Sequence, residues 1–247
     1  INDGEVLFTG STFTGNRITS YSSVIPKGGV IYGNNSQISL QGCVLDSNMV
    51  SGNGKGVLVF SEGDQSSLTL INVNTAENTG TELFHFTSGG TLTVTDSHLS
   101  ENIGHGIFSQ SGLLTADVIN SEINNNTGYG LWANGSKTVS SSSVSGNSLG
   151  GIKGAGSLTL NLSSVDNNIG TGISGTTGSF NSTGSSFTGN TLQAVNATAT
   201  LNFNNVDVIG NGSGISGSGV INFVDVNINN NTGFGLNYTG NKTFETV

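Results

Sequence analysis

The residues of this chain that could do acid–base chemistry are few and scattered. The 247 residues include 15 Asp and Glu, three His and one Cys. Hydrolysis of a glycosidic bond needs two carboxylates at a set separation. Asp96, Asp117, Asp207 and Asp225 instead stand singly between apolar positions, and the sequence contains no Asp-Asp pair. We therefore expect no catalytic residues and a chain that is not an enzyme.

Metal chemistry is also poorly supported. His85, His98 and His105 have no metal-ligand spacing with one another or with Cys43. Calcium requires six to eight converging oxygens. We therefore predict no metal site and no cofactor, and a His98 that faces solvent. Cys43 is predicted to be a small core residue, since a lone cysteine forms no disulfide framework within the chain.

The overall charge excludes some partners. The formal net charge is −9, with only six Lys and Arg in the chain. Nucleic acid is therefore a poor electrostatic partner. No apolar run reaches the length of a membrane span.

The elements that would position any site are set by an internal repeat, an apolar residue followed by two residues and an asparagine. The interval between successive asparagines shortens from 32 residues (Asn16 to Asn48) to 20 (Asn211 to Asn231), and it is near 21 in the second half. Such a period indicates a solenoid. The asparagine column comprises Asn16, Asn48, Asn78, Asn102, Asn126, Asn147, Asn168, Asn190, Asn211 and Asn231.

Apolar residues recur ten, eight and three positions before each asparagine, with Thr75, Lys137 and Ser182 as exceptions, and a slim residue stands five positions before it. Alternation over three to five residues is typical of strands, not of helices. We therefore predict an all-β fold, a right-handed parallel β-helix of about ten turns of roughly 21 residues. The asparagines are expected at bends with a left-handed backbone, with amides stacked in hydrogen-bonding range.

Residues 1–247 should form a single β-helix domain, a fragment of a longer protein, with irregular turns in 1–90 and regular turns in 91–247. Insertions after Asn16, Asn48 and Asn78 should emerge on one face, which in solenoids is often the binding face. An equally good interpretation is that these irregular turns lie near a capping end of the solenoid. Trp132 is predicted to point outward, where an aromatic ring can contact a sugar or a partner. The ligand-binding candidates are Arg17, Tyr21, Lys27, Tyr32, Lys55 and Trp132.

The repeat accounts for the one motif that suggests a polysaccharide-active site. Gly104-His105-Gly106 matches the Gly-His-Gly of polygalacturonases, but neighbouring turns read Gly128-Tyr-Gly130 and Gly233-Phe-Gly235, so the glycines belong to the repeat. We also expect no two acids to share one column in adjacent turns. Both observations disfavour such an enzyme.

The column pattern resembles the generic parallel β-helix repeat over nearly the whole chain. Gly28-Gly29-Val30-Ile31, with Phe13 to Asn16 and Phe187 to Asn190, resembles the repeats of chlamydial polymorphic membrane proteins, which are autotransporter adhesins. The wider class is the passenger domain of a bacterial autotransporter or two-partner-secreted adhesin. The resemblance implies a protein that is secreted or displayed at the cell surface, anchored to the outer membrane.

These observations favour a bacterial adhesin that attaches to a host extracellular-matrix protein or a cell-surface glycan. Two alternatives stay open. The rod could associate with copies of itself on neighbouring cells and drive aggregation and biofilm formation, or it could be a β-helix that binds or cleaves a polysaccharide. An ice-binding solenoid is disfavoured because Thr-x-Thr columns do not recur.

Overall fold

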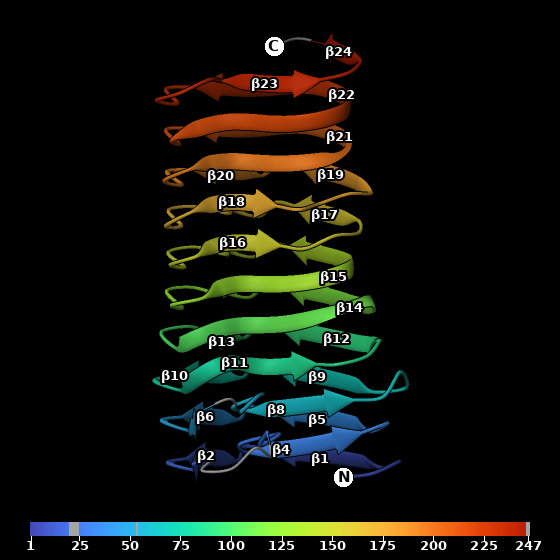
Figure 1. The fold of residues 1–247 in the computed structure, drawn as a ribbon, viewed down its shortest axis with the longest axis vertical. Coiled ribbons are helices and arrows are strands. Elements are labelled where there is room, and N and C mark those ends of the chain that lie inside the picture. Colours follow the sequence, from blue (N-terminus) through green and yellow to red (C-terminus); the bar gives the residue numbers. More distant parts are fainter. Residues whose placement is uncertain (20–24, 53, 246–247) are drawn as a thin grey trace.

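The chain forms one continuous coil of parallel β-strands (Figure 1). The computed structural model describes residues 1–19, 25–52 and 54–245, and no helix occurs among them. This confirms the predicted all-β parallel β-helix. The solenoid has about eight turns, fewer than the ten predicted.

Short strands separated by bends make up each turn, and in several turns they merge across a bend. Their bounds are β1 Glu5–Thr9, β2 Thr12–Thr14, β3 Arg17–Thr19, β4 Ile31–Asn34, β5 Gln37–Gln41, β6 Val44–Asp46, β7 Met49–Ser51, β8 Val59–Glu62, β9 Ser67–Ile71, β10 Asn74–Ala76, β11 Thr79–Phe86, β12 Gly90–Thr95, β13 His98–Leu99, β14 Ile103–Ile119, β15 Tyr129–Ser140, β16 Gly150–Lys153, β17 Leu158–Asn161, β18 Thr171–Ser174, β19 Ser179–Thr183, β20 Ser186–Thr188, β21 Gln193–Ile209, β22 Ser213–Asn229, β23 Leu236–Thr239 and β24 Lys242–Glu245.

Equivalent residues of successive turns pair in register, so that like side chains stack. Ile38 pairs with Val6 in one neighbouring turn and with Leu68 in the other, and Leu68 pairs with Leu92. Because side chains alternate across a strand, this register sends the apolar columns inward. The resulting core is continuous along the rod, and Cys43 lies in it fully buried, as predicted.

The asparagine column is a buried hydrogen-bonded ladder. Each asparagine from Asn16 to Asn211 donates both its backbone N–H and its side-chain Nδ2 to the Oδ1 of the asparagine one turn on, as Asn126 does to Asn147 at 3.1 Å for both bonds. The Nδ2 of Asn147 also donates to the carbonyl of Ile123 at 2.9 Å. The predicted stacking of amides is therefore present.

The predicted left-handed backbone at the ladder asparagines was wrong. Among the described residues the positive φ falls one position earlier, for example at Ser47 (57°), Glu101 (59°) and Asn125 (56°). The bend at that residue turns the following asparagine inward, where its amide joins the ladder. A second left-handed residue stands six positions before each ladder asparagine, and Asn72, Asp96 and Asn120 are examples.

Lys137 is the one charged residue in the apolar column ten positions before the ladder. It is 2% exposed, and its Nζ donates to the carbonyl oxygens of Ala133, Gly135 and Ala155 at 2.8 to 3.0 Å. Burial lowers the pKa of Lys137 to about 8, because a charged ammonium is disfavoured away from water. The ammonium has carbonyl partners but lies in the core of the rod.

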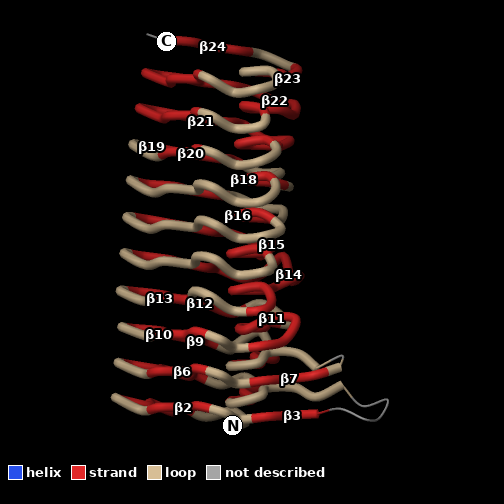
Figure 2. Tube along the Cα trace, turned by 90° about the vertical axis from the view of Figure 1, so that its left-hand side faces the viewer, coloured by secondary structure: helices blue, strands red, loops and turns tan. Residues whose placement is uncertain are grey.

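The predicted insertions leave the coil near its N-terminal end (Figure 2). The β3 strand pairs with β7, which pairs with the start of β11, and Lys27 pairs with Lys55 in an isolated bridge. The extra segments therefore stack on one another instead of projecting independently. The described part of the chain contains no helix that is long and apolar enough to cross a membrane.

Candidate functional site: an aromatic and lysine face

Four of the six ligand-binding candidates lie on one face of the rod. They are Lys27, Tyr32, Lys55 and Trp132, and contacts with a shared row of rings connect them. Arg17 is exposed in β3, outside this row, and pairs with Met49. Tyr21 lies outside the described residues.

The row consists of outward side chains that the strand register aligns. Tyr32 pairs with Phe60, Phe60 with His85, His85 with Phe108 and Phe108 with Trp132. Their ring centroids are 6.1, 4.8, 5.0 and 4.9 Å apart, and the first three pairs are stacked while the last is edge-on. Both arrangements are favourable for aromatic pairs.

The middle of the row is covered although it points away from the core. Phe60, His85 and Phe108 are only 1%, 4% and 5% exposed. Lysines from the insertions cover them, since the Nζ of Lys27 lies 5.2 Å from the Phe60 ring centroid and that of Lys55 lies 5.8 Å from the Phe108 centroid. The insertions thus form a second packed layer outside the coil.

Two glutamates lie next to these lysines and offset their positive charges. Glu62 accepts from the Nζ of Lys27 at 2.9 Å and from the hydroxyl of Tyr32 at 2.9 Å. The hydrogen bond from Lys27 holds the pKa of Glu62 below its usual value, and the hydrogen bond to Glu62 raises the pKa of Tyr32. The second acid, Glu82, is 5% exposed.

Glu82 lies among polar groups of its own strand, β11, and of the insertion that carries Lys55. Its carboxylate accepts from the Thr81 hydroxyl at 2.5 Å and lies 3.7 Å from both Lys55 Nζ and His85 Nδ1. Burial works to raise the pKa of Glu82, but the Thr81 hydroxyl and the neighbouring His85 and Lys55 outweigh it, so that the pKa is lowered. Glu82 therefore remains ionised at neutral pH and holds Lys55 over the aromatic row.

The row opens to solvent at Trp132. Its neighbours Tyr129, His105 and Lys153 are also partly exposed. The Nζ of Lys153 lies 4.1 Å from the Trp132 centroid and 4.6 Å from that of Tyr129, a cation–π arrangement. Trp132 points outward as predicted, but it is half-buried because Phe108, His105 and Tyr129 pack against its ring edge-on.

His105 is part of this platform, not a free acid or base. Its Nδ1 accepts a hydrogen bond from the backbone N–H of Tyr129 at 2.9 Å, and its ring stacks on Tyr129. Burial lowers the pKa of His105, so the imidazole is neutral at pH 7. His98, in contrast, is exposed, as predicted.

Sequence reasoning missed Phe60, His85, Phe108, Tyr129 and Lys153. A signal for most of them was present, because each ring of the row directly follows an inward apolar residue, as in Val59-Phe60, Ile107-Phe108 and Leu131-Trp132. Comparing the outward position that follows this apolar residue from turn to turn would have indicated the row of rings, just as the inward positions indicated the core.

The acids do not assemble into a metal site among the described residues, where no group of three or more His, Cys, Asp or Glu could hold an ion. One expectation about acids was wrong. Glu77 and Glu101 occupy the same repeat position in adjacent turns, with Glu77 N donating to Glu101 O at 3.1 Å. Both are exposed at the left-handed bend before the ladder.

Comparisons of the chain with protein-family models, with curated proteins and with solved structures gave no match. The resemblance to autotransporter adhesins therefore remains a prediction from the sequence.

Proposed function

We propose that this chain is the adhesive rod of a secreted or surface-displayed bacterial protein, and that it attaches to a host matrix protein or glycan through the aromatic and lysine face. The observation that carries the proposal is the convergence of Lys27, Tyr32, Lys55 and Trp132 on one row of rings. Three of the six basic residues of an otherwise acidic chain lie on this face.

The open platform of Trp132, Tyr129 and Lys153 has the composition of a contact surface. Tryptophan and tyrosine dominate the binding energy of many interfaces, and their rings stack on apolar faces of ligands. Among the described residues Lys153 forms no ion pair with a carboxylate, so its ammonium is available to an acceptor group of a partner. The continuous hydrogen-bonded coil beneath holds these side chains on a rigid support.

The test is retention of the purified chain on an array of matrix proteins, neutral glycans and acidic polysaccharides. Retention on a matrix protein or glycan at moderate salt supports adhesion. Retention on a single polysaccharide, with shortened products appearing in solution, contradicts it and favours an enzyme.

Self-association is the second candidate, and a different observation favours it. Large apolar side chains lie exposed on the bend after the ladder in three successive turns, Leu149 at 50%, Ile169 at 60% and Leu192 at 56%. Exposed apolar rows of this kind can mark interaction surfaces. Sedimentation velocity over a hundredfold range of concentration tests it, and a monomer throughout contradicts it.

A further inference from the structure

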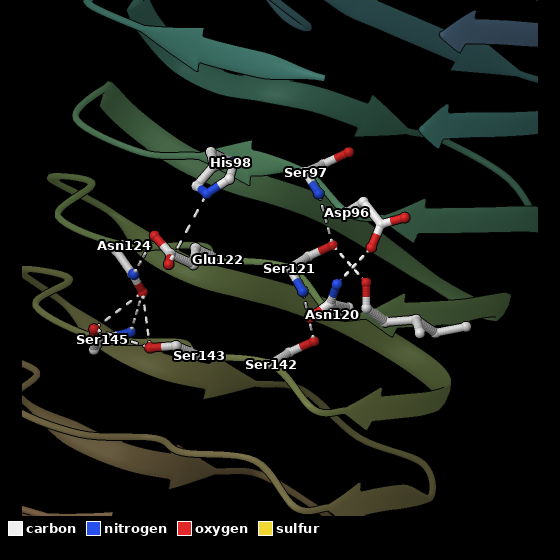
Figure 3. Close-up of polar contacts among 11 residues, drawn as sticks. Asp96, Ser97, His98, Asn120, Ser121, Glu122, Asn124, Ser142, Ser143 and Ser145 are labelled. Carbon is white, nitrogen blue, oxygen red and sulfur yellow. Dashed lines mark hydrogen bonds and ion pairs between the residues drawn. The ribbon is translucent and has the colours of Figure 1, made fainter. Parts of the chain in front are cut away.

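A polar groove runs along the rod on a surface separate from the aromatic and lysine face. Its volume is about 690 Å³, and it is lined by three consecutive repeat positions in successive turns from Asp96 to Asp207. Buried serines such as Ser121, Ser142 and Ser163 form its floor, so we call it the serine groove. Figure 3 shows its N-terminal part, with His98 and Glu122 on one rim.

The serine hydroxyls on the floor of the serine groove already have hydrogen-bond partners within the fold. The Oγ of Ser142 accepts the backbone N–H of Ser121 at 3.0 Å and donates to the carbonyl of Ser140 at 2.7 Å, and Ser163 repeats this one turn on. The rim backbone is paired as well, since Ser164 N donates to Ser142 O. An extended peptide therefore finds no open strand edge here, and recognition must come from side chains.

Leu162 is the exception in this groove. It has a left-handed backbone, with φ of 50°, and its side chain is 69% exposed. All the other described turns place Gly, Asn, Asp or Ser at the same position, for example Asn120, Ser141 and Gly184. Leucine is disfavoured in that conformation, and exposure offers no packing in return. Residues held in unfavourable conformations concentrate at functional sites.

Space for the Leu162 side chain is left by its neighbour in the next turn. A Cβ at Gly184 would lie 2.8 Å from Leu162 Cδ2, so any larger residue there would push the leucine aside. An exposed apolar side chain thus lies on the rim of a groove whose polar lining groups are hydroxyls, amides, carboxylates and the imidazole of His98. A ligand that fits this lining combines apolar C–H faces with many hydroxyls.

The charges on the rims restrict the ligand further. Asp96, Glu122 and Asp207 line the groove, and the only cationic candidate is His98, whose Nε2 lies 4.0 Å from Glu122 Oε1. A polymer of uronic acids or a sulfated chain would be repelled. Rim positions recur once per turn, about every 4.8 Å, which suits a polymer whose repeating unit is a sugar ring.

We propose that the serine groove binds an extended glycan chain without acidic groups, lying along the rod axis with the C–H face of a sugar ring on Leu162. Hydroxyls of neighbouring rings would donate to Glu122 and Asp207 and exchange hydrogen bonds with serines and asparagines of the rims. This site is additional to the aromatic and lysine face and does not depend on it.

Leu162→Asn separates a binding role from a structural one. Asparagine tolerates the left-handed backbone, so the variant should melt at the same or a higher temperature than the wild type. We expect its affinity for soluble neutral β-glucan oligomers, measured by calorimetry, to fall at least fivefold. Leu192→Asn, which removes a similarly exposed leucine outside the groove, should bind these oligomers like the wild type.

Chitosan oligomers, polygalacturonate and a basic oligopeptide are the remaining probes. Binding of glucan or chitosan that Leu162→Asn weakens supports the proposal, and Glu122→Gln should weaken chitosan binding more than glucan binding. Equal binding by the wild type and Leu162→Asn, preference for polygalacturonate or the peptide, or no binding of any glycan would each overturn it.

Discussion

The stability of the rod should rise with pH because of Lys137. Its ammonium lies 2% exposed in the core, and its pKa in the folded chain is about 8, against 10.5 as the ordinary value. Since the folded state binds the proton more weakly than the unfolded state does, the charge destabilises the fold below pH 8, and this cost is lost as pH rises toward 10.5.

The size of the effect follows from the two pKa values. A difference of about 2.5 pKa units corresponds to about 3 kcal/mol below pH 8, at 1.36 kcal/mol per unit. About 2 kcal/mol of this should be recovered between pH 7 and pH 9.5. For a chain of this length that equals a rise of about 4–8 °C in melting temperature. The pH range ends at 9.5 because burial and hydrogen bonding raise the pKa values of Tyr238 and Tyr32, which would oppose the gain above pH 10.

The assay is thermal or urea unfolding at pH 7.0 and 9.5 for the wild type, Lys137→Met and Lys242→Met. Methionine keeps the length of the side chain and removes the charge, so Lys137→Met should be at least as stable as the wild type at pH 7 and should show no rise. Lys242 is exposed, and its variant should behave like the wild type. A wild-type stability that is flat between the two pH values, or an equal rise in Lys137→Met, would refute the reasoning.

Two further predictions concern buried polar groups. Asn147→Ala removes the acceptor of the Asn126 N–H and Nδ2 and a donor to Ile123 O, all of which are buried. It should lower the free energy of unfolding, measured in urea, by about 3–5 kcal/mol. Asn231→Ala, at the partly exposed end of the ladder, should lower it by about 1 kcal/mol. An equal loss for the two variants would contradict the ladder's role. Glu82→Gln addresses acid stability. Since the folded pKa of Glu82 is lowered, the wild type should lose stability as pH falls below about 4.5, and the variant should lose less between pH 7 and 3.5. Parallel acid-unfolding curves for the two proteins would count against the lowered pKa.

The fold could be predicted from the sequence because the packing of successive turns requires apolar residues at inward positions. These positions recur at a regular interval along the chain. The asparagine interval and the apolar residues ten, eight and three positions before it are enough to place the columns. The position of the left-handed bend was missed because the ladder asparagines are selected for their amides, while the residue before them carries the backbone strain.

The candidate site could be predicted only in part. Lys27, Tyr32, Lys55 and Trp132 were found as unusual residues, but their convergence depends on how the insertions stack on β8, β11 and β14. Those contacts join segments that are distant in the sequence, and the insertions do not repeat, so no sequence pattern indicates them. Leu162 was not predicted for a related reason. A leucine in a repeat is expected in the core unless the position of the left-handed bend is known.

The central claim is that attachment occurs through the aromatic and lysine face. The most direct measurement is surface plasmon resonance of the wild type, Trp132→Ala and Lys153→Met on the matrix or glycan surface, other than a glucan or chitosan, that retains the wild type best, with circular dichroism as a check of folding. We predict that both variants stay folded and lose at least tenfold in affinity, and that Leu192→Asn does not. Unchanged affinity in both variants, or no retention of the wild type on any surface, would contradict the claim.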